Sequence, residues 1–328
     1  MLVLGATGGV GGAIARALAD HGWTVRAMVR DIAKAKAAWK TPVIPEFVAG
    51  DAMKREDVIQ AATNGGAVDV IVHAVNPPGY RNWDKVVLPM IDNTIAAASA
   101  AEGARILLPG TVYNYNPVDT PVIDETTPQN AITRKGKIRI ALEKRLADAT
   151  SEVPSVIVRA GDFYGPNTRA SWFAQAMITP GKPVRKVTSM AAGVPHAYAY
   201  LPDLAESFAQ LLDRSDSLRP HEVVQFEGTW DADGRTMLDT IRKVVGRDLP
   251  QKAFPWWLMR LLAPFGGFPK EALEIEPVWR HPMRPDNGRL VELLGQEPRT
   301  PIATAIEHTL INMGCLAETS PSSISLTA

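Results

Sequence analysis

Short apolar runs alternate with stretches of helical periodicity throughout the first 165 residues. The runs are almost entirely aliphatic, so each predicted strand is covered on both faces. Parallel strands joined by helices have this pattern, and we predict an α/β fold with a doubly wound (Rossmann) parallel sheet. The expected strands span 2–4, 24–29, 43–48, 68–72, 105–108 and 155–158, and the expected helices span 9–20, 31–40, 54–63, 84–101 and 129–150.

A glycine-rich turn lies between the first predicted strand and the first predicted helix. Gly5 permits a tight turn, Gly8 lets the main chain approach a pyrophosphate, and Gly11 lets the helix pack closely on the strand. Amide groups at the helix start then meet the phosphate charge. A plain flexible loop is the alternative, but strand, spacing and helix favour a dinucleotide site. Its expected contacts are Gly5, Ala6, Thr7, Gly8, Gly9, Val10 and Gly11.

Arg30 follows the second predicted strand, where NAD sites usually carry an acidic residue that binds the adenosine ribose. An arginine at this place pairs with a 2′-phosphate through its planar set of donors. The sequence therefore favours NADP, with NAD possible. The alternative is a solvated surface arginine, with Asp31 capping the next helix.

The charge balance limits the classes of partner. Thirty-five basic and thirty-five acidic residues give a formal charge of zero. Nucleic acids and anionic membranes attract net or patterned positive charge, so we expect neither as a main partner. The single cysteine, Cys315, and the absence of a signal-like or membrane-spanning stretch favour the cytoplasm. The six histidines show no metal-ligand spacing, so we expect no metal site.

The rhythm of strands and helices breaks up after residue 166. We expect an NADP-binding Rossmann domain over 1–165, returns to it near 198–226, a mostly C-terminal substrate region over 166–316 and a flexible tail over 317–328. In the returns, 198–212 predicts a strand end and a helix capped near Asp203, and 221–226 predicts a strand. The tryptophans of the last third form either a local aromatic core or an apolar substrate pocket. His196 faces the substrate cleft or a surface turn.

Four motifs in order resemble the extended short-chain dehydrogenases/reductases of the NAD-dependent epimerase/dehydratase type. They are the glycine turn, 48–51, 71–74 and 159–166. The resemblance implies that Asp51 and Ala52 approach the adenine, that His73 and Ala74 pass beneath the ribose and phosphates, and that Phe163 or Tyr164 lines the nicotinamide pocket. The alternatives are a helix N-cap for Asp51, a buried hydrogen-bonded imidazole for His73 and plain packing for the two aromatic residues.

The chain departs from that family at all three usual catalytic positions. The family carries a serine or threonine after the fifth strand and a tyrosine-x-x-x-lysine helix; here Pro109, Lys135 and Arg139 stand in these places. The resemblance leaves Arg139 to hold the ribose, and Thr111 with Tyr113 to supply hydroxyls. Cationic neighbours and partial burial would favour proton loss from Lys135, making it a second candidate donor. The alternative is that this basic run, with Glu143 outside, is a solvated helix face.

These observations favour an NADP-dependent reductase or dehydrogenase of a small carbonyl, enone or hydroxyl compound. Two alternatives stay open: a nucleotide-sugar epimerase or dehydratase, and a non-catalytic NADP-binding sensor or scaffold, which the altered catalytic positions favour. The family resemblance also implies a possible homodimer. In it the helix before the fifth strand, with the small residues 96–101, and the altered catalytic helix pack against their mates, unless the small residues pack on the chain's own sheet.

Overall fold

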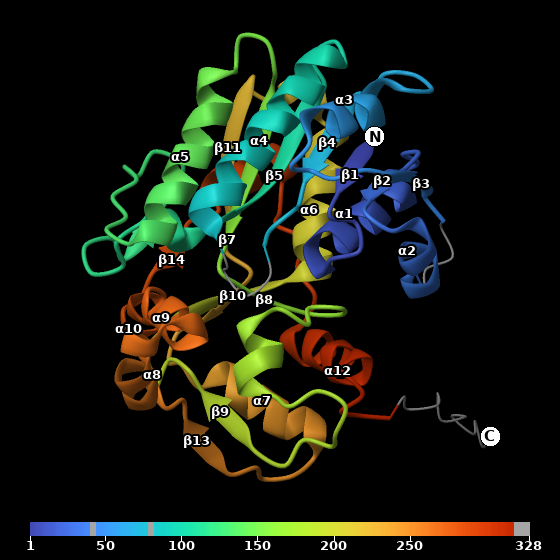
Figure 1. Ribbon diagram of the computed structural model, residues 1–328. Coiled ribbons are helices and arrows are strands. Elements are labelled where there is room, and N and C mark those ends of the chain that lie inside the picture. The colour runs from blue at the N-terminus through green and yellow to red at the C-terminus, as the bar shows by residue number, and fades with distance from the viewer. Residues whose placement is uncertain (40–43, 78–81, 318–328) are drawn as a thin grey trace, which may run out of the picture.

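A seven-stranded parallel sheet forms the centre of the computed structural model, which describes residues 1–39, 44–77 and 82–317 (Figure 1). Its strand order is β3-β2-β1-β4-β5-β7-β11, and every neighbouring pair is parallel. The doubly wound sheet predicted from the sequence is therefore confirmed. The strands are β1 (Leu2–Leu4), β2 (Arg26–Val29), β3 (Glu46–Ala49), β4 (Val70–His73), β5 (Arg105–Thr111), β7 (Ser155–Ala160) and β11 (His221–Phe226).

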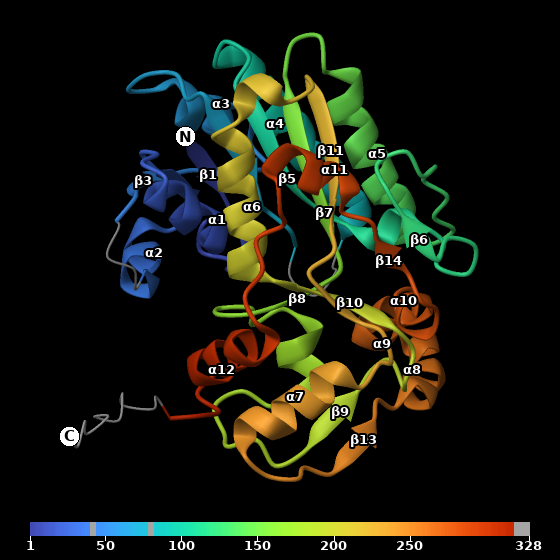
Figure 2. The ribbon, with the colours of Figure 1, turned by 180° about the vertical axis from the view of Figure 1, so that it is seen from behind.

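Helices cover both faces of this sheet (Figures 1 and 2). In β1, Val3 packs with α1 and α6 on one face, whereas Leu2 and Leu4 pack with α3, α4 and α5 on the other. This double burial explains why the strand is apolar throughout. The flanking helices are α1 (Gly9–Asp20), α6 (Leu201–Leu212) and α11 (Gly288–Leu294) on the first face, and α3 (Arg55–Thr63), α4 (Trp83–Ala100) and α5 (Arg134–Asp148) on the second.

Capping side chains set where several helices begin. The Asp31 carboxylate accepts a hydrogen bond from the Lys34 amide at 3.0 Å and caps α2 (Ile32–Ala38), as the sequence suggested. The Thr133 hydroxyl accepts one from the Gly136 amide at 3.1 Å, so α5 begins at residue 134 rather than at 129. The cap expected near Asp203 is wrong, because Tyr200 precedes α6 and Asp203 instead binds the Thr300 amide at 2.7 Å.

The small residues before β5 pack inside the chain. Ala97 and Ala98 of α4 are fully buried in the core that this helix shares with α3, α5 and the sheet. Packing on the chain's own sheet, the alternative to a role in a dimer, is confirmed for these two alanines. The homodimer remains a prediction.

A second group of elements lies at the carboxyl ends of the strands, in the lower half of Figure 1. It holds a core rich in aromatic side chains, including Tyr164, Trp172, Trp256 and Trp279. The local aromatic core expected for the later tryptophans is confirmed for Trp256 and Trp279. Its elements are β8 (Asp162–Tyr164), η3 (Phe173–Met177), β9 (Val187–Ser189), β10 (His196–Tyr200), β12 (Thr229–Asp231), α7 (Thr236–Val245), β13 (Gln251–Ala253), α8 (Trp256–Leu262), η5 (Ala263–Phe265), α9 (Gly267–Leu273), α10 (Glu276–Arg280) and α12 (Ile302–Asn312).

Short segments connect the two groups. The loop after β5 contains η2 (Val112–Asn114) and β6 (Val122–Ile123), and β6 pairs with β14 (Arg284–Pro285) of the C-terminal part; η4 (Ser215–Ser217) follows α6. Across 1–39, 44–77 and 82–317, no helix has the length and apolar character that a membrane crossing needs. Of the expected tail, residues 318–328 lie outside the described part of the chain, as does Val43 of the third expected strand.

Candidate cofactor and substrate site

The glycine turn after β1 leaves no room for side chains at two positions. Gly5 has φ +91°, and a Cβ atom on it would lie 2.5 Å from the Ala74 carbonyl oxygen. A Cβ atom on Gly11 would lie 2.4 Å from the Gly5 carbonyl oxygen. Both distances are shorter than any real carbon contact, so glycine is required for the turn and for packing of α1 against it.

The first turn of α1 presents its backbone amides to a ligand. Gly8 precedes the helix, no side chain caps it, and the first turn carries no acidic residue. Thr7 and Gly8 are exposed, and Gly9 packs so closely on the loop after β8 that its Cβ atom would meet the Asn167 carbonyl oxygen at 2.8 Å. Free amides and the positive end of the helix dipole bind phosphate, so the cradle fits a dinucleotide pyrophosphate.

Arg30 lies at the same edge of the sheet as the glycine turn. Leu4 of β1 pairs with Met28 of β2, so the residues after both strands are neighbours at their carboxyl ends. The side chain of Arg30 is exposed and forms no salt bridge to the parts of the chain described here, whereas Asp31 is engaged in capping α2. The Arg30 guanidinium is therefore free to meet an anion beside the turn.

The turn after β3 is ordered by hydrogen bonds rather than by a helix cap. The Asp51 carboxylate accepts a hydrogen bond from the Met53 amide at 3.0 Å, and the Asp51 amide donates one to Asp57 at 2.9 Å. Lys54, not Asp51, precedes α3, so the N-cap alternative for Asp51 is wrong. Ala52 is buried beside it. The role of both residues toward the adenine remains a prediction.

His73, at the end of β4, is a buried neutral imidazole, as one of our two interpretations predicted. Its Nδ1 lies 2.8 Å from the hydroxyl of Thr94, which donates its own proton to the Met90 carbonyl. The Nδ1–H group must therefore be the donor, which leaves Nε2 as an acceptor. Burial, aided by the nearby Arg139 cation, lowers the pKa of His73 from 6.5 to about 3.

Arg139 projects from α5 toward α4. Its guanidinium carbon lies 4.7 Å from the centre of the Trp83 ring, a cation–π contact.

Of the two aromatic residues after β7, Tyr164 is fully buried against Phe173 and Tyr200, so for Tyr164 the packing interpretation is confirmed. Phe163 is half-buried against the main core, and its place beside the nicotinamide remains a prediction.

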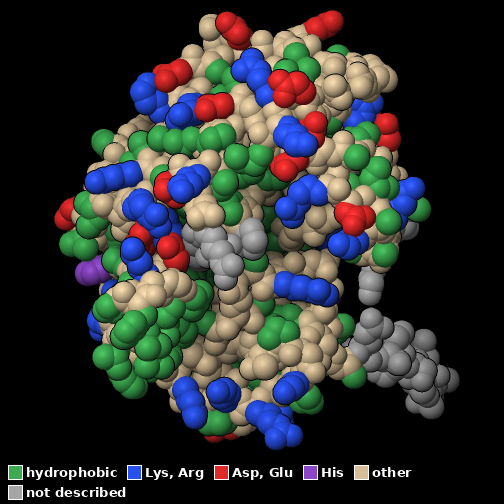
Figure 3. All heavy atoms as spheres, in the orientation of Figure 1, with side chains coloured by type: hydrophobic (Ala, Val, Ile, Leu, Met, Phe, Trp, Pro, Cys, Tyr) green, Lys and Arg blue, Asp and Glu red, His purple; other side chains and the backbone are tan. Residues whose placement is uncertain are grey.

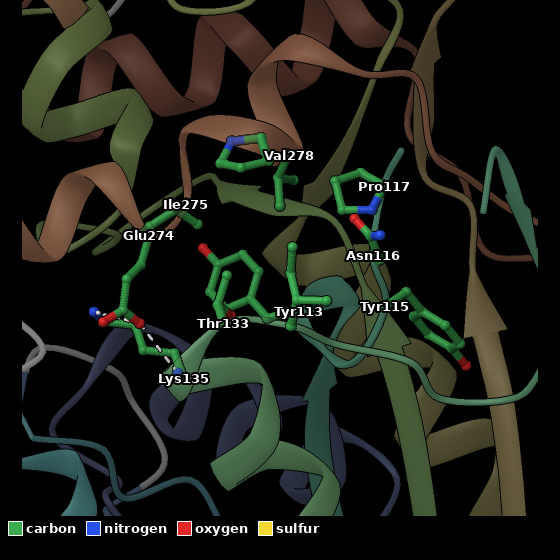
Figure 4. A pocket seen from close by; sticks show the side chains of 11 residues that line it. Tyr113, Tyr115, Asn116, Pro117, Thr133, Lys135, Glu274, Ile275 and Val278 are labelled. Carbon is green, nitrogen blue, oxygen red and sulfur yellow. Dashed lines mark hydrogen bonds and ion pairs between the residues drawn. The ribbon is translucent and has the colours of Figure 1, made fainter. Parts of the chain in front are cut away.

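Tyr113 lines an apolar pocket between the loop after β5, the start of α5 and the C-terminal elements α9 and α10 (Figure 4). The Thr111 hydroxyl accepts a hydrogen bond from the Tyr113 amide at 3.3 Å and so orders the loop. Gly136 packs so tightly on this loop that its Cβ atom would lie 2.3 Å from the Tyr113 carbonyl oxygen. The pocket walls are Tyr113, Tyr115, Asn116, Pro117, Ile132, Thr133, Lys135, Glu274, Ile275, Pro277 and Val278.

Lys135 is buried, with 1% of its surface exposed. Its ammonium forms ion pairs with Glu271 and, at 3.4 Å, with Glu274. Glu274 also accepts a hydrogen bond from the Lys135 backbone amide at 3.1 Å (Figure 4). The prediction that Lys135 has mainly cationic surroundings is therefore wrong, because two carboxylates from the C-terminal part compensate its charge. Arg134 pairs with the same carboxylates at 3.2 and 3.4 Å.

A second buried ion pair joins α5 to β7. The Arg159 guanidinium donates to both carboxylate oxygens of Glu143, at 2.6 to 3.2 Å, and also to the Tyr115 hydroxyl. Gln129 donates to Glu143 at 2.6 Å. Glu143 thus faces inward, which corrects the solvated placement considered for it. Burial raises the pKa of Tyr115 to about 12, so this hydroxyl keeps its proton.

His196 occupies neither of the places expected for it. It lies in the buried strand β10, where Nε2 is 2.8 Å from the Asp162 carboxylate. Its ring stacks on Trp279 with centroids 3.8 Å apart. Within 1–39, 44–77 and 82–317, no group of three or more histidine, cysteine or acidic side chains is arranged to hold a metal ion.

Residues 1–225 match the NAD dependent epimerase/dehydratase family, which is more than half of the chain. The chain belongs to this family. A relative described as "3-diazoavenalumate denitrifying reductase", from a Streptomyces species, is 27% identical over 181 residues, which are 51% of this chain and 57% of that protein. The chain thus spans a little over half the length of this relative.

Solved structures share the fold of this epimerase/dehydratase chain over nearly its whole length. UDP-glucose 4-epimerase from Bifidobacterium longum, in complex with NAD+ and UDP, has a TM-score of 0.71 at 14% identity and covers 96% of this chain and 99% of its own. A putative epimerase from Burkholderia cenocepacia has a TM-score of 0.74 at 16% identity, with 96% and 98% covered. At such identities the likeness establishes the fold alone.

Sequence reasoning missed several groups beside α5, the helix of the predicted catalytic positions. Glu271 and Glu274 lie 136 and 139 positions after Lys135, and no local pattern in the sequence links them. Asn114, in the loop after β5, is fully buried, and within the described part of the chain neither polar atom of its side chain has a hydrogen-bond partner. Because buried amides are normally paired, Asn114 is a candidate contact for a ligand or water.

Proposed function

We propose that this protein is an NADP-dependent reductase or dehydrogenase of a small, uncharged carbonyl, enone or hydroxyl compound. One observation carries the proposal: the pyrophosphate cradle at Gly5–Gly11 and the exposed Arg30 lie at the same end of the parallel strands. Among the residues that the structure describes, Arg30 forms no salt bridge. A 2′-phosphate carries the charge that a free guanidinium at this place binds.

The apolar pocket at Tyr113 supports a substrate without charge. Apart from Lys135 and Glu274, its walls are neutral, and these two side chains neutralise one another. A diphosphate or carboxylate would find no free cation among these walls. The cavity has a volume of about 20 Å³, which is room for one small group, and an apolar or weakly polar carbonyl group suits its lining better because such a group loses little hydration on entry.

Tyr113 is the proposed proton donor. When bound, the reduced nicotinamide supplies the hydride, which leaves the substrate oxygen in need of a proton. The Tyr113 side chain lines the pocket with its hydroxyl, and Thr111 holds the backbone of the loop. We assign Arg139 to the ribose hydroxyls, with Asp51, Ala52, His73, Ala74 and Phe163 as further cofactor contacts. Lys135, enclosed by carboxylates, anchors α9 to α5 through its ion pair with Glu271.

A nucleotide-sugar epimerase is the second candidate, because the structural neighbours include UDP-sugar epimerases. That reaction oxidises and then reduces its substrate within one cycle, and two 4-epimerases among the neighbours are described in complex with NAD+ or NAD. Arg30 favours NADP instead.

We also retain the cytoplasm as the proposed compartment, because the sequence has one cysteine and Cys315 is buried.

One experiment separates the enzyme from a sensor that binds NADP without turnover. The purified chain is titrated with NADPH and NADP, and the NADPH complex is then mixed with carbonyl and enone compounds while the absorbance of reduced cofactor is followed. Loss of absorbance with an apolar carbonyl or enone supports the proposal. Tight binding of both cofactor forms with no turnover across the set contradicts it and favours the sensor.

A further inference from the structure

Apolar side chains are unusually exposed on the hairpin formed by α8, η5 and α9, residues 256–273. The patch is visible at the lower left of Figure 3, over the position that these helices occupy in Figure 1. Scattered exposed apolar residues are ordinary, but a contiguous group of large ones marks an interaction surface. The exposed members are Trp257 at 67%, Leu261 at 63%, Leu262 at 37%, Phe265 at 87% and Phe268 at 42%.

The other side of the hairpin is fixed to the aromatic core. Trp172 contacts Trp256 and Phe268, with ring centroids 6.4 and 5.7 Å apart. The Trp256 indole donates a hydrogen bond to the Met190 carbonyl at 3.2 Å. The hairpin is therefore held in place without its outer residues, so the exposure of Trp257, Leu261 and Phe265 is not explained by the packing of the fold.

The charge of this segment has one sign. Between residues 249 and 270 the sequence contains no aspartate or glutamate, whereas Lys252, Arg260 and Lys270 are all exposed. Arg260 contacts Glu276 at 2.6 Å yet keeps 60% of its side chain exposed. The next acidic residues along the chain, Glu271 and Glu274, are occupied by Lys135 and Arg134. The patch thus combines apolar side chains with the exposed cations Lys252 and Lys270, for which the described part of the chain shows no salt bridge, and with Arg260, which Glu276 pairs.

This combination favours an anionic partner over a second copy of the chain. A two-fold interface would bring the same patch together from both copies and set Lys252, Arg260 and Lys270 against their own equivalents, which is repulsive. The patch also ends in Phe265, which is 87% exposed. Projecting tryptophan, phenylalanine and leucine with flanking lysine and arginine are the residues that enter the headgroup region of a bilayer.

We propose that the α8–α9 hairpin docks the protein on an anionic lipid surface, with Trp257, Leu261 and Phe265 inserted at the headgroup level. The mode is peripheral, so it needs no membrane-spanning helix. It also revises our sequence-based expectation of no membrane partner, which rested on the charge of the whole chain. Because α9 carries both Phe268 of the patch and Glu271 of the Lys135 ion pair, docking would bring the apolar pocket near the lipid surface.

Sedimentation of the full chain with vesicles tests this proposal. We expect the protein to bind vesicles of phosphatidylcholine with roughly one third phosphatidylserine more tightly than pure phosphatidylcholine, and to lose binding as salt is raised. Replacing Trp257, Leu261 and Phe265 together by serine should lower the affinity at least about tenfold, because apolar insertion is lost. Lys252→Gln with Lys270→Gln should lower it by roughly tenfold on anionic vesicles alone.

The matched control replaces two exposed apolar residues elsewhere, Ile44→Ser with Val118→Ser, which are 73% and 57% exposed. This variant should bind as the wild type does, and thermal unfolding checks that all variants are folded. Equal binding of the serine triple variant, or no preference for anionic vesicles, overturns the proposal. A wild-type dimer that the triple variant dissociates, without any vesicle binding, also overturns it and makes the patch an interface between copies. Neither outcome bears on the cofactor titration.

Discussion

Glu274 contacts Lys135 twice: its carboxylate accepts a hydrogen bond from the Lys135 amide at 3.1 Å and lies 3.4 Å from the Lys135 ammonium. The amide belongs to the first turn of α5, where backbone donors have no acceptor within the helix, so Glu274 both caps the helix and compensates a buried charge. A residue from the C-terminal part thereby orders α5, the helix on which we predict the altered catalytic positions. The parallel-sheet part and the C-terminal part of the chain are joined at this point.

Removing the Lys135 charge should cost far more stability than removing an exposed lysine from the same helix. Lys135→Met removes the buried cation that pairs with Glu271 and Glu274 and leaves these carboxylates to the half-exposed Arg134, and we expect the free energy of unfolding to fall by about 3 kcal/mol. Lys144→Met, which breaks an exposed pair with Asp148, should cost less than about 1 kcal/mol. Urea unfolding of both variants makes the comparison, and equal losses would show that burial of Lys135 is energetically unimportant.

Tyr113→Phe should abolish most turnover while leaving cofactor binding intact. If the Tyr113 hydroxyl donates the proton, its loss lowers kcat by about 100-fold or more, because general acid catalysis contributes about that much. Lys135→Met should lower kcat less, since the ammonium is enclosed by carboxylates. Steady-state kinetics on an identified substrate, with NADPH affinity measured in parallel, decides between them. Full turnover in both variants would exclude both as donors.

The buried His73 should make stability depend on pH. Its folded pKa, about 3, lies below the unfolded value of 6.5, so only the unfolded chain binds this proton in between. The free energy of unfolding that depends on neutral His73 is therefore fully present above pH 6.5 and is lost as pH falls toward 3. From pH 7 to pH 5 we expect the free energy of unfolding to fall by about 2 kcal/mol more in the wild type than in His73→Asn. Parallel pH dependences in urea unfolding would contradict this prediction.

Arg30→Ala should change the choice of cofactor. Losing a charge-assisted contact to the 2′-phosphate should weaken NADPH binding about tenfold and leave NADH binding unchanged. Lys34→Ala, which removes a neighbouring lysine whose side chain is 88% exposed, is the control for general loss of positive charge. Fluorescence titration of both cofactors gives the affinity ratio. An unchanged ratio in Arg30→Ala would remove the basis for NADP.

Local patterns predicted the sheet, its helices and the phosphate turn. The periodicity, and the glycines at Gly5 and Gly11, depend only on residues that are close together in the sequence. Contacts that depend on distant segments were not predictable. Lys135 looked like the centre of a cationic run, yet its partners come from α9, more than a hundred residues later. His196 looked like a residue of a turn or cleft, and only the pairing of β8 with β10 brings it to Asp162.

We infer that this family member transfers a hydride from NADPH to a small apolar substrate, and isotope transfer tests this inference most directly. NADPH carrying deuterium at the hydride-donating carbon is incubated with the chain and the carbonyl or enone compounds, and the products are analysed by mass spectrometry. We expect deuterium on the carbon that is reduced, and far less of it with Tyr113→Phe. Cofactor that stays bound and fully deuterated, with unlabelled compounds throughout, would contradict it.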